Sequence, residues 1–349
     1  MSGTKISEYQ RVLVTGSAGF IGSHMVTRLL ERQVETWGID VPIQDRGPHQ
    51  RDRLEWIHSH GHCNLYHDVA VDIRHTESLA LCIEEIRPDL VFHFAALPGV
   101  NPSWEQPSDY VTTNVLGTLN VLEAAASLDS PPRLLLASSS SVYGANDGHP
   151  VNEKDTTDWP LSIYAATKKA DEAIAHAYAH KYGLAITMLR LFSVYGPWGR
   201  PDMAPLRLAD SILLQVPVRL TWAGQQLRDY TYIDDVIDVL ERLASTPRPE
   251  TLSESGPRSF EAMNVGGGQP VPLLQVAETL ASNLRCSLNV ELLGPVVGEP
   301  EWTFGDDSAL VARIGPVDWT PIDIGLAALA QWHLERSRTT AAAREFGEG

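Results

Sequence analysis

The sequence predicts an α/β fold, in which a doubly wound parallel sheet is joined to a smaller, interleaved C-terminal lobe. Two observations support this prediction. The apolar run 11–15 leads directly into three glycines spaced G-x-x-G-x-x-G and then into a helical pattern. Further apolar runs alternate with helical patterns up to residue 191, an order typical of parallel strands covered by helices. With 349 residues, 43% of them apolar, the chain is long enough to bury a large core.

The glycine-rich segment predicts a Rossmann-type dinucleotide site. Gly16, Gly19 and Gly22 allow a tight turn, close approach of a pyrophosphate to the backbone, and close packing of the helix on the strand. Amides at the start of the next helix would bind the phosphates. The following strand, 35–39, ends at Asp40, whose carboxylate can accept both ribose hydroxyls and would repel a 2′-phosphate. NAD is therefore favoured over NADP, although Asp40 could also serve only as a turn residue.

Two more strands are expected to end at the same edge of the sheet. The first covers 68–72, and the Asp72 carboxylate could bind the adenine amino group. The second covers 89–96 and ends in small residues, where a backbone can pass close to a cofactor. Within it, His93 is expected to be a hydrogen-bonded core histidine and not a catalyst. A long helix is predicted over 104–127.

Catalytic residues are expected in two segments. The serine run 138–141 follows the apolar strand 134–137, so its hydroxyls lie where ligands bind in open α/β sheets. A helix is predicted from Tyr164 to about Tyr182, and in it Tyr164 and Lys168 share a face because they are four residues apart. The lysine ammonium and a positive nicotinamide ring would favour the phenolate form of Tyr164. Such a tyrosine can take a proton from a hydroxyl while a hydride leaves the same carbon.

The rest of the chain is expected to complete the sheet and to form the second lobe. A strand is predicted over 185–191, followed by an irregular segment over 192–203 that is rich in Gly and Pro. Residues 226–235 precede a helix that ends near Leu243, and residues 245–258 are expected to form a loop. The glycine run 266–268 is expected to be a turn, and two further helices follow it.

These elements predict two intimately joined lobes. The NAD-binding domain is expected to comprise residues 1–190 and about 229–262, and the substrate-binding lobe about 191–228 and 263–335. The Ala/Arg/Glu/Gly-rich end, residues 336–349, is expected to be a flexible tail that frays from about residue 339.

Composition argues against several other classes of function. The net charge of −17, from 27 basic and 44 acidic residues, disfavours nucleic acid as a partner. The three cysteines form no C-x-x-C pair and indicate no disulfide framework. Four histidines lie in a polar segment without a converging carboxylate or cysteine pattern, so no metal site is expected; they are His58, His60, His62 and His67. The polar start, and the lack of an apolar run near the ~20 residues that span a bilayer, predict a cytoplasmic protein.

Together these motifs resemble the extended short-chain dehydrogenase/reductases, and among them the nucleotide-sugar epimerases, over residues 11–336. The run 194–204, Val-Tyr-Gly-Pro-Trp-Gly-Arg-Pro-Asp-Met-Ala, is similar to the corresponding run of UDP-glucuronate 4-epimerases. The serine run as far as Gly144 and the segment 164–169 match that family too. The resemblance implies NAD as cofactor and a UDP-sugar as substrate. It implies epimerisation at C4, through a transient 4-keto sugar, of UDP-glucuronate to UDP-galacturonate.

The resemblance also implies a role for each matching residue. Tyr164 would be the base, Lys168 its electrostatic partner and a ribose ligand, and Ser139 the catalytic serine. Eleven residues would line NAD, namely Gly16, Gly19, Phe20, Ile21, Gly22, Asp40, Asp72, Ile73, Ala95, Ala96 and Lys168. Six would bind the nucleotide sugar, namely Ser139, Ser140, Ser141, Ser193, Arg200 and Arg228, with Arg228 on the diphosphate. Arg200 could equally form a structural ion pair with Asp202 or another carboxylate.

Two positions depart from the family pattern. The family usually has an arginine in a Gly-Val-Arg-Tyr-Ser loop, and this chain has Asn101 at that place, so one positive charge near the sugar is missing. The family's threonine before Val-Tyr-Gly-Pro is Ser193 here, which keeps the hydroxyl. The first departure bears on whether the sugar is a uronate. The resemblance further implies a homodimer in which the helices near 104–127 and 162–181 pair across a two-fold axis.

The residues after the catalytic serine separate the alternatives. Dehydratases and decarboxylases of the superfamily carry acidic residues where this chain has Ser140 and Ser141. Neither serine can act as a general acid or base near neutral pH, but both can hydrogen-bond to a carboxylate. Epimerisation is therefore favoured over decarboxylation to a UDP-pentose, and 4-epimerisation of a non-uronate sugar is the other enzymatic alternative. A catalytically silent NAD-sensing scaffold is the alternative from another class, which the intact Ser139, Tyr164 and Lys168 disfavour.

Overall fold

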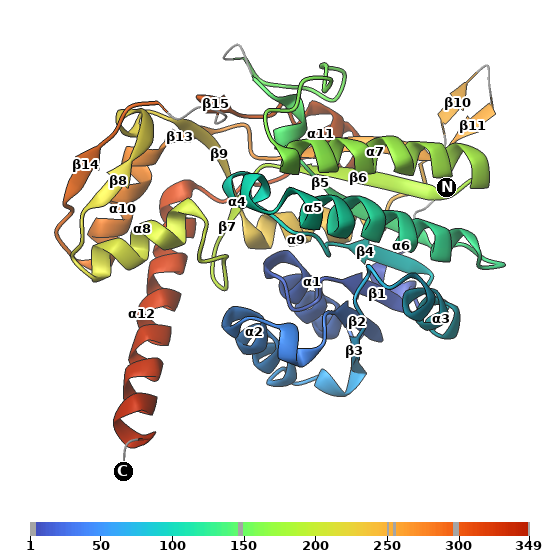
Figure 1. The fold of residues 1–349 in the computed structure, drawn as a ribbon, viewed down its shortest axis with the longest axis horizontal. Helices are drawn as coiled ribbons and strands as arrows, with labels where there is room; N and C mark the ends of the chain where they lie inside the picture. The colour runs from blue at the N-terminus through green and yellow to red at the C-terminus, as the bar shows by residue number, and fades with distance from the viewer. Residues whose placement is uncertain (1–4, 146–148, 250, 254–255, 296–299, 348–349) are drawn as a thin grey trace.

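A computed structural model of the chain describes residues 5–145, 149–249, 251–253, 256–295 and 300–347. Its centre is a sheet of seven parallel strands in the order β12-β6-β5-β4-β1-β2-β3 (Figure 1). This order places the first strand inside the sheet, between β4 and β2, and confirms the predicted doubly wound fold. The strands are β1 (Val12–Thr15), β2 (Thr36–Asp40), β3 (Tyr66–Ala70), β4 (Leu90–His93), β5 (Arg133–Ser139), β6 (Ala185–Leu191) and β12 (Phe260–Val265).

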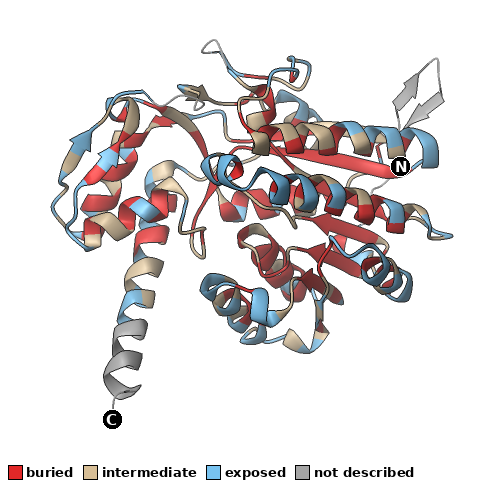
Figure 2. Cartoon of the chain, in the orientation of Figure 1, coloured by how far each residue is buried: buried red, intermediate tan, exposed pale blue. Residues whose placement is uncertain are grey.

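Helices cover both faces of this sheet (Figure 2). The strands β1, β4 and β6 are therefore buried along their whole length, whereas the edge strand β3 is largely exposed. One face is covered by α1 (Phe20–Glu31), α2 (Pro48–His58), α9 (Ile233–Ala244) and α11 (Ser308–Ile314). The other is covered by α3 (Thr76–Ile86), α6 (Gly117–Ala126) and α7 (Ile163–Tyr182). Strand β1 shows how one strand serves both layers: Val12 and Val14 belong to the first core, and Leu13 belongs to the second.

The second lobe is built around a small sheet in which β9 (Leu227–Tyr232) pairs with three strands. These are β7 (Ser193–Tyr195), β13 (Pro270–Pro272) and β15 (Trp302–Thr303). Strands β8 (Val218–Leu220) and β14 (Val290–Leu292) form a separate pair. Three helices pack on one another beside them, namely α8 (Ala204–Leu213), α10 (Leu273–Leu284) and α12 (Ile322–Gly347). Their apolar faces make a core of their own, distinct from the two cores of the large sheet.

The helix predicted over 104–127 is broken. The structure has α4 (Val100–Glu105), α5 (Pro107–Tyr110), a π-helical segment η4 (Val111–Leu116) and then α6. The break lies at Gln106, whose φ of −130° and ψ of 52° are not helical. Pro107 is the cause, because proline disfavours the helical conformation in the residue before it and itself starts a new helix well.

Four further expectations differ from the structure. The segment 192–203 is not wholly irregular, because β7 pairs with β9 in parallel. The expected loop 245–258 contains a hairpin of β10 (Thr251–Ser253) and β11 (Gly256–Arg258). In the described part of the chain, three helices and not two follow the glycine turn. The tail expected from residue 336 is instead helical, since α12 continues to Gly347 and extends away from the body of the chain (Figure 1); residues 348–349 lie outside the described residues.

Three further observations concern the cysteines, membrane spans and metal ligands. The cysteines Cys63, Cys82 and Cys286 are all free thiols. Within the described ranges, no helix combines the length and apolarity that crossing a bilayer requires. In the same part of the chain, no three His, Cys, Asp or Glu side chains converge as metal ligands would.

Candidate functional site

Most of the predicted site residues lie in segments that follow strands of the large sheet, at the edge where the parallel strands end. Thr15 at the end of β1 is level with Ile39 of β2 and His93 of β4. On the next strands, His93 is level with Leu136, and Ser139 is level with Leu191. The segments that follow these strands therefore emerge side by side, on the side where open α/β sheets bind their ligands.

The turn after β1 has the geometry that a dinucleotide requires. Gly16 has a φ of +69°, and a Cβ there would lie 2.7 Å from the Ala95 amide nitrogen. A Cβ on Gly22 would lie 2.1 Å from the Gly16 carbonyl oxygen, so the start of α1 packs directly on the turn. Gly19 is the N-cap of α1. The backbone is thus exposed to a ligand at a helix N-terminus, which fits a pyrophosphate.

Asp40 connects this turn to the end of β2. Its carboxylate accepts hydrogen bonds from the Ala18 amide and from the Val41 amide, both 2.9 Å long. Burial raises the pKa of Asp40, and the hydrogen bond from Ala18 partly opposes that shift. The carboxylate therefore shapes the turn from beside it, and its predicted bond to a ribose stays a prediction.

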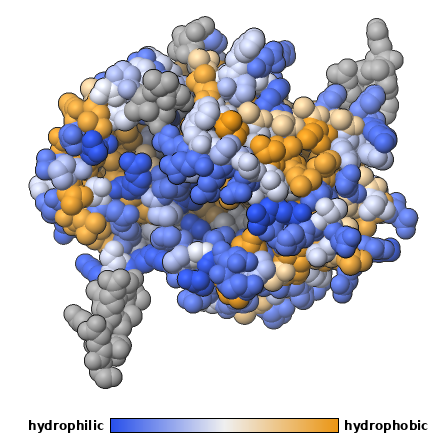
Figure 3. Space-filling model, viewed as in Figure 1, coloured by the Kyte–Doolittle hydropathy of each residue, from blue (hydrophilic) through white to orange (hydrophobic). Residues whose placement is uncertain are grey.

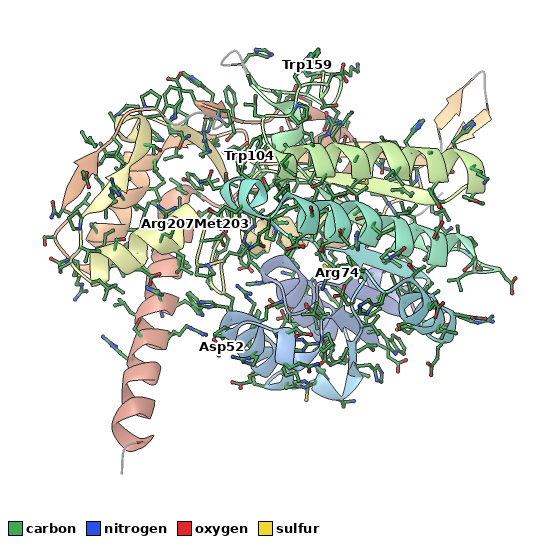
Figure 4. The ribbon with its side chains drawn as sticks, in the orientation of Figure 1. Asp52, Arg74, Trp104, Trp159, Met203 and Arg207 are labelled. Carbon is green, nitrogen blue, oxygen red and sulfur yellow. The ribbon has the colours of Figure 1, made fainter. Side chains whose placement is uncertain are left out.

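Asp72 follows β3 and is held by its neighbour Arg74. The Arg74 Nε lies 3.0 Å and 2.9 Å from the two carboxylate oxygens, and Nη2 lies 2.6 Å from one of them (Arg74 is labelled in Figure 4). Burial opposes the ionised form, but the hydrogen bonds from Arg74 lower the pKa of Asp72. Ile73 packs so tightly on α6 that a Cβ on Gly117 would lie 2.5 Å from its Cδ1. This arrangement fixes the rim at which adenine binding is predicted.

The serine run changes conformation at Ser139. Ser139 ends β5, and residues 140–143 form a short 3₁₀ helix, η5. The Ser139 Oγ accepts a hydrogen bond from the Ser141 amide (3.1 Å) and lies 3.1 Å from the Ser141 hydroxyl oxygen. The 3₁₀ turn thus holds the hydroxyls of Ser139 and Ser141 together at the end of the strand.

Tyr164 and Lys168 lie in the first turns of α7. Ser162 caps this helix by accepting a hydrogen bond from the Ala165 amide (3.1 Å). The Tyr164 ring meets the Tyr110 ring edge to face, with 6.4 Å between their centroids. Lys168 is buried, and its ammonium donates to the Asp171 carboxylate over 3.2 Å. Capping and burial together orient the two side chains that the sequence predicts to work as a pair.

His93 is a core histidine, as predicted. Its Nδ1 lies 2.6 Å from the Thr15 hydroxyl and its Nε2 lies 3.0 Å from the Thr118 hydroxyl. Burial, with a smaller contribution from the nearby Lys168, lowers the pKa of His93 to about 3. The ring is therefore neutral at physiological pH, and both of its nitrogens are occupied within the core.

Comparison with known proteins agrees with this geometry. Residues 12–266 match the profile of the NAD dependent epimerase/dehydratase family. The chain belongs to this family. It is 36% identical over 341 residues to a probable UDP-glucuronate 4-epimerase of Rhizobium meliloti (strain 1021), covering 94% of this chain and 98% of that protein. It is 37% identical over 331 residues to UDP-glucuronate 4-epimerase 4 of Arabidopsis thaliana, covering 93% and 75% respectively.

A solved structure shares the whole fold of this epimerase/dehydratase. It is the UDP-glucuronic acid 4-epimerase from Bacillus cereus in complex with UDP-glucuronic acid and NAD. The TM-score is 0.80 at 31% sequence identity, over 93% of this chain and 98% of that one. Membership in the family confirms the resemblance inferred from the sequence motifs.

The residues predicted to bind the nucleotide sugar come from both lobes of the epimerase/dehydratase. Ser193 begins β7, two residues after the end of β6. Arg200 forms an ion pair with Asp202, and its Nη2 lies 3.6 Å from the position of a Cβ on Gly99. Of the two readings of Arg200, the ion pair is thus present, and the guanidinium also lies next to the loop that precedes Asn101.

Arg228 lies at the start of β9 in the second lobe. Its Nη1 donates to the carbonyl of the preceding residue, Leu227 (2.9 Å), and to the carbonyl of Glu301 (3.3 Å). These contacts hold the guanidinium near the strand, and its predicted contact with a diphosphate stays a prediction.

Sequence reasoning missed Arg53, which joins the two halves of the site. From α2 its buried guanidinium donates to the carbonyls of Trp198 (2.8 Å) and Gly199 (2.9 Å) and lies 3.5 Å from the Ala18 carbonyl. Burial, with the positive charge of Arg200 nearby, lowers the pKa of Arg53 to about 10. The glycine turn and the segment before α8 are thus linked by one side chain. No local pattern indicates this, because the partners are backbone groups far along the chain.

Asn114 is a second residue that the sequence did not assign to the site. From the π-helical segment its Oδ1 accepts from the Leu97 amide (2.7 Å), and its Nδ2 donates to the Leu97 carbonyl and the Thr167 hydroxyl (both 3.0 Å). Asn114 therefore ties the loop after β4 to α7, one residue before Lys168. The local pattern does not show that this asparagine is buried, because the adjacent Thr112 and Thr113 are also polar.

A buried polar network lies behind the serine run. Glu172 accepts from the Ser138 hydroxyl (2.7 Å) and forms two 2.9 Å hydrogen bonds with Arg190. The Arg190 Nη1 donates to the Tyr143 hydroxyl (2.9 Å), which donates to the side-chain Oδ1 of Asn264 (2.6 Å). Because Ser138 precedes Ser139 directly, this network fixes the strand end that carries the serine run.

Proposed function

We propose that the chain catalyses the NAD-dependent epimerisation of UDP-glucuronate at C4, which gives UDP-galacturonate. The observation that carries this proposal is the set of Ser139, Tyr164 and Lys168 beside the carboxyl edge of the sheet, with serines and no carboxylates at positions 140 and 141. The similarity to UDP-glucuronate 4-epimerases along nearly the whole chain supports it.

Each of the three residues has a distinct task. The Tyr164 phenolate takes the proton from O4 of the sugar, and Tyr164 returns a proton when the keto group is reduced. The Lys168 ammonium stabilises the phenolate, and the Ser139 hydroxyl hydrogen-bonds to O4. The glycine turn would hold NAD, which when bound would supply the hydride acceptor and donor for C4, so no net cofactor would be consumed. The 4-keto sugar must rotate within the site between the two hydride transfers, so that its other face meets the nicotinamide.

A uronate places a further demand on the site. Its 4-keto form is a β-keto acid, which loses CO₂ readily, so an epimerase must hold the carboxylate without promoting that loss. Ser140, Ser141 and Ser193 supply hydroxyl donors and no acid or base that works near neutral pH. The Arg200 guanidinium beside Gly99 supplies a cation near the loop in which the family's arginine is replaced by Asn101. These observations favour epimerisation over decarboxylation to a UDP-pentose.

The test is an assay of purified protein with UDP-glucuronate. We expect UDP-galacturonate to form and to be converted back to UDP-glucuronate, and NAD to co-purify with the protein. The absorbance of reduced nicotinamide should show no net accumulation of NADH. Stoichiometric NADH release would instead indicate a dehydrogenase, and a UDP-pentose as the main product would indicate a decarboxylase. If only a neutral sugar such as UDP-glucose is epimerised, Asn101 marks a different specificity.

Replacing Ser141 with alanine is expected to raise KM for UDP-glucuronate about tenfold or more and to leave UDP-glucose almost unaffected. A hydrogen bond to a charged acceptor contributes about 1.5–3 kcal/mol, which corresponds to a tenfold or larger change in affinity. UDP-glucose has no carboxylate, so its binding does not depend on this hydrogen bond. A looser grip should also increase the trace of UDP-4-keto-pentose. The measurement is KM for both sugars, with Ser127→Ala as control, since the Ser127 hydroxyl only donates to the Ala124 carbonyl at the end of α6. Equal effects on both sugars would place the carboxylate elsewhere.

The protein is also proposed to be a homodimer. Helices α6 and α7 pack side by side, and Figure 3 shows apolar surface over this region. Val111 and Leu116 of η4 are exposed there. In a dimer with a two-fold axis through this region, the apolar surface of each subunit would be buried against that of the other. Two-fold dimers are also the commonest oligomers. Light scattering is expected to give twice the chain mass; a stable monomer at micromolar concentration would exclude the dimer.

The expected cytoplasmic location stays a prediction.

A further inference from the structure

A carboxylate lies directly against Lys168 in the interior of the site. Asp171 follows Lys168 by three residues, so the two side chains share one face of α7. The Lys168 ammonium and the Asp171 Oδ2 are 3.2 Å apart, and the side chains are only 3% and 2% exposed. The lysine that is proposed to stabilise the Tyr164 phenolate therefore has a buried counter-charge of its own.

Asp171 is poorly compensated for a buried carboxylate. Its Oδ1 is buried and has no hydrogen-bond partner among the residues that the structure describes. Burial raises the pKa of Asp171 to about 6, against the opposing effect of Lys168. A buried ionised group with one partner is costly, and an unsatisfied polar atom adds to that cost. An apolar side chain at position 171 would pack in this interior without that cost. We therefore look for the role of the carboxylate in its effect on Lys168.

The other charged groups considered around α7 have partners of their own and do not pair with Lys168 or Asp171. On the same helix, Glu172 is next to Asp171, but its carboxylate is bonded to Arg190 of β6. On β4, His93 is neutral and hydrogen-bonded on both nitrogens. Glu172 makes ionisation of Asp171 harder, and among the residues that the structure describes Lys168 is the cation that favours it.

Uncharged groups lie on three elements that pack against α7. Asn114, from η4, bonds to Thr167 of α7. Tyr110, from α5, contacts the Tyr164 ring, and Tyr143, from η5, is bonded to Arg190. None of these groups supplies a second counter-charge to Lys168.

We propose that Asp171 is a positioning residue that holds the Lys168 ammonium and reduces its electrostatic pull on the Tyr164 hydroxyl. A negative charge 3.2 Å from the ammonium cancels part of its field at the tyrosine and occupies one of its three N–H donors. Asp171 thereby sets the lower end of the pH range in which Tyr164 acts as a base. This inference rests on the proposed role of Tyr164 in epimerisation.

The test is the Asp171→Asn variant, studied as the NAD-bound protein. Asparagine keeps the shape and removes the charge, so the Lys168 ammonium acts on Tyr164 undiminished. The acid limb of the kcat profile for UDP-glucuronate is expected to move to lower pH by about one unit. Asp158→Asn is the matched control, because Asp158 is an exposed carboxylate before α7 and its loss changes the net charge equally. The control profile should coincide with that of the unmodified protein.

A spectroscopic titration makes the test independent of turnover. The tyrosinate absorbance of the NAD-bound protein, minus that of its Tyr164→Phe variant, isolates Tyr164 among the ten tyrosines. This ionisation should also move down in Asp171→Asn, and in Asp171→Ser if the asparagine variant folds poorly. An unmoved or upward-shifted ionisation, with NAD content and melting temperature preserved, overturns the inference. Absence of epimerisation in the unmodified protein would instead refute the proposed function and leave the titration interpretable.

Discussion

Replacing Tyr164 with phenylalanine is expected to lower the turnover of UDP-glucuronate by at least ~10²-fold. The variant loses only the phenolic oxygen, so O4 keeps its proton and the hydride cannot leave C4 at a useful rate. The edge-to-face contact with the Tyr110 ring remains. NAD content should therefore stay close to that of the unmodified protein. Turnover in the linear phase of the epimerisation assay, normalised to bound NAD, measures the effect.

Tyr178→Phe is the matched control for this experiment. Tyr178 lies on the same helix, and its hydroxyl donates to the Glu123 carboxylate at the surface (3.2 Å). The substitution removes the same atom from α7 away from the strand ends, so turnover should stay within a few-fold. If Tyr164→Phe behaves like the control, another group is the base and the assignment of Tyr164 is wrong.

The large sheet could be predicted because its inner strands are buried on both faces. Such strands show as continuous apolar runs, as in Ala185–Leu191, where every residue of β6 is buried. The alternation of strands and helices then leaves little freedom in topology, since parallel crossovers have one hand. The small strands β7 and β15 could not be predicted in this way. They pair with β9, and that pairing depends on contacts across the second lobe and not on any local pattern.

The same distinction holds within the site. Tyr164 and Lys168 were predicted as a pair because helical spacing alone puts them on one face. Lys168 and Asp171 have helical spacing too, but a nearby acidic residue on a helix is ordinarily an exposed partner. Only the fold shows that this pair is buried. Arg53 could not be found from the sequence at all, because it binds the carbonyls of Trp198 and Gly199, and every residue has a carbonyl.

The network behind the serine run is expected to be the most sensitive part of the fold. Replacing Glu172 with glutamine should lower the free energy of unfolding by about 3–5 kcal/mol, because Arg190 would keep its charge in a buried site without a counter-charge. Burial opposes the charged form, but the bonds to Glu172 raise the pKa of Arg190, so the guanidinium stays charged. Denaturant unfolding of the NAD-bound protein measures the change.

Glu291→Gln provides a control that separates burial from charge. Glu291 pairs with Arg219 over 3.1 Å, but these side chains are 51% and 65% exposed. Exposed pairs contribute no more than about 1 kcal/mol, so this variant should unfold almost like the unmodified protein. Equal losses in the two glutamine variants would mean that burial does not strengthen the Glu172–Arg190 pair.

The double variant Glu172→Leu/Arg190→Met tests whether the loss comes from an unpaired charge. It removes both charges at once and should recover part of the stability that the single substitution loses, since apolar pairs often replace buried ion pairs at little cost. It should not recover turnover, because the Ser138 hydroxyl still lacks its acceptor and Ser139 follows directly in the strand. Recovery of stability without turnover would show that this ion pair is kept in the core to hold the serine run in place.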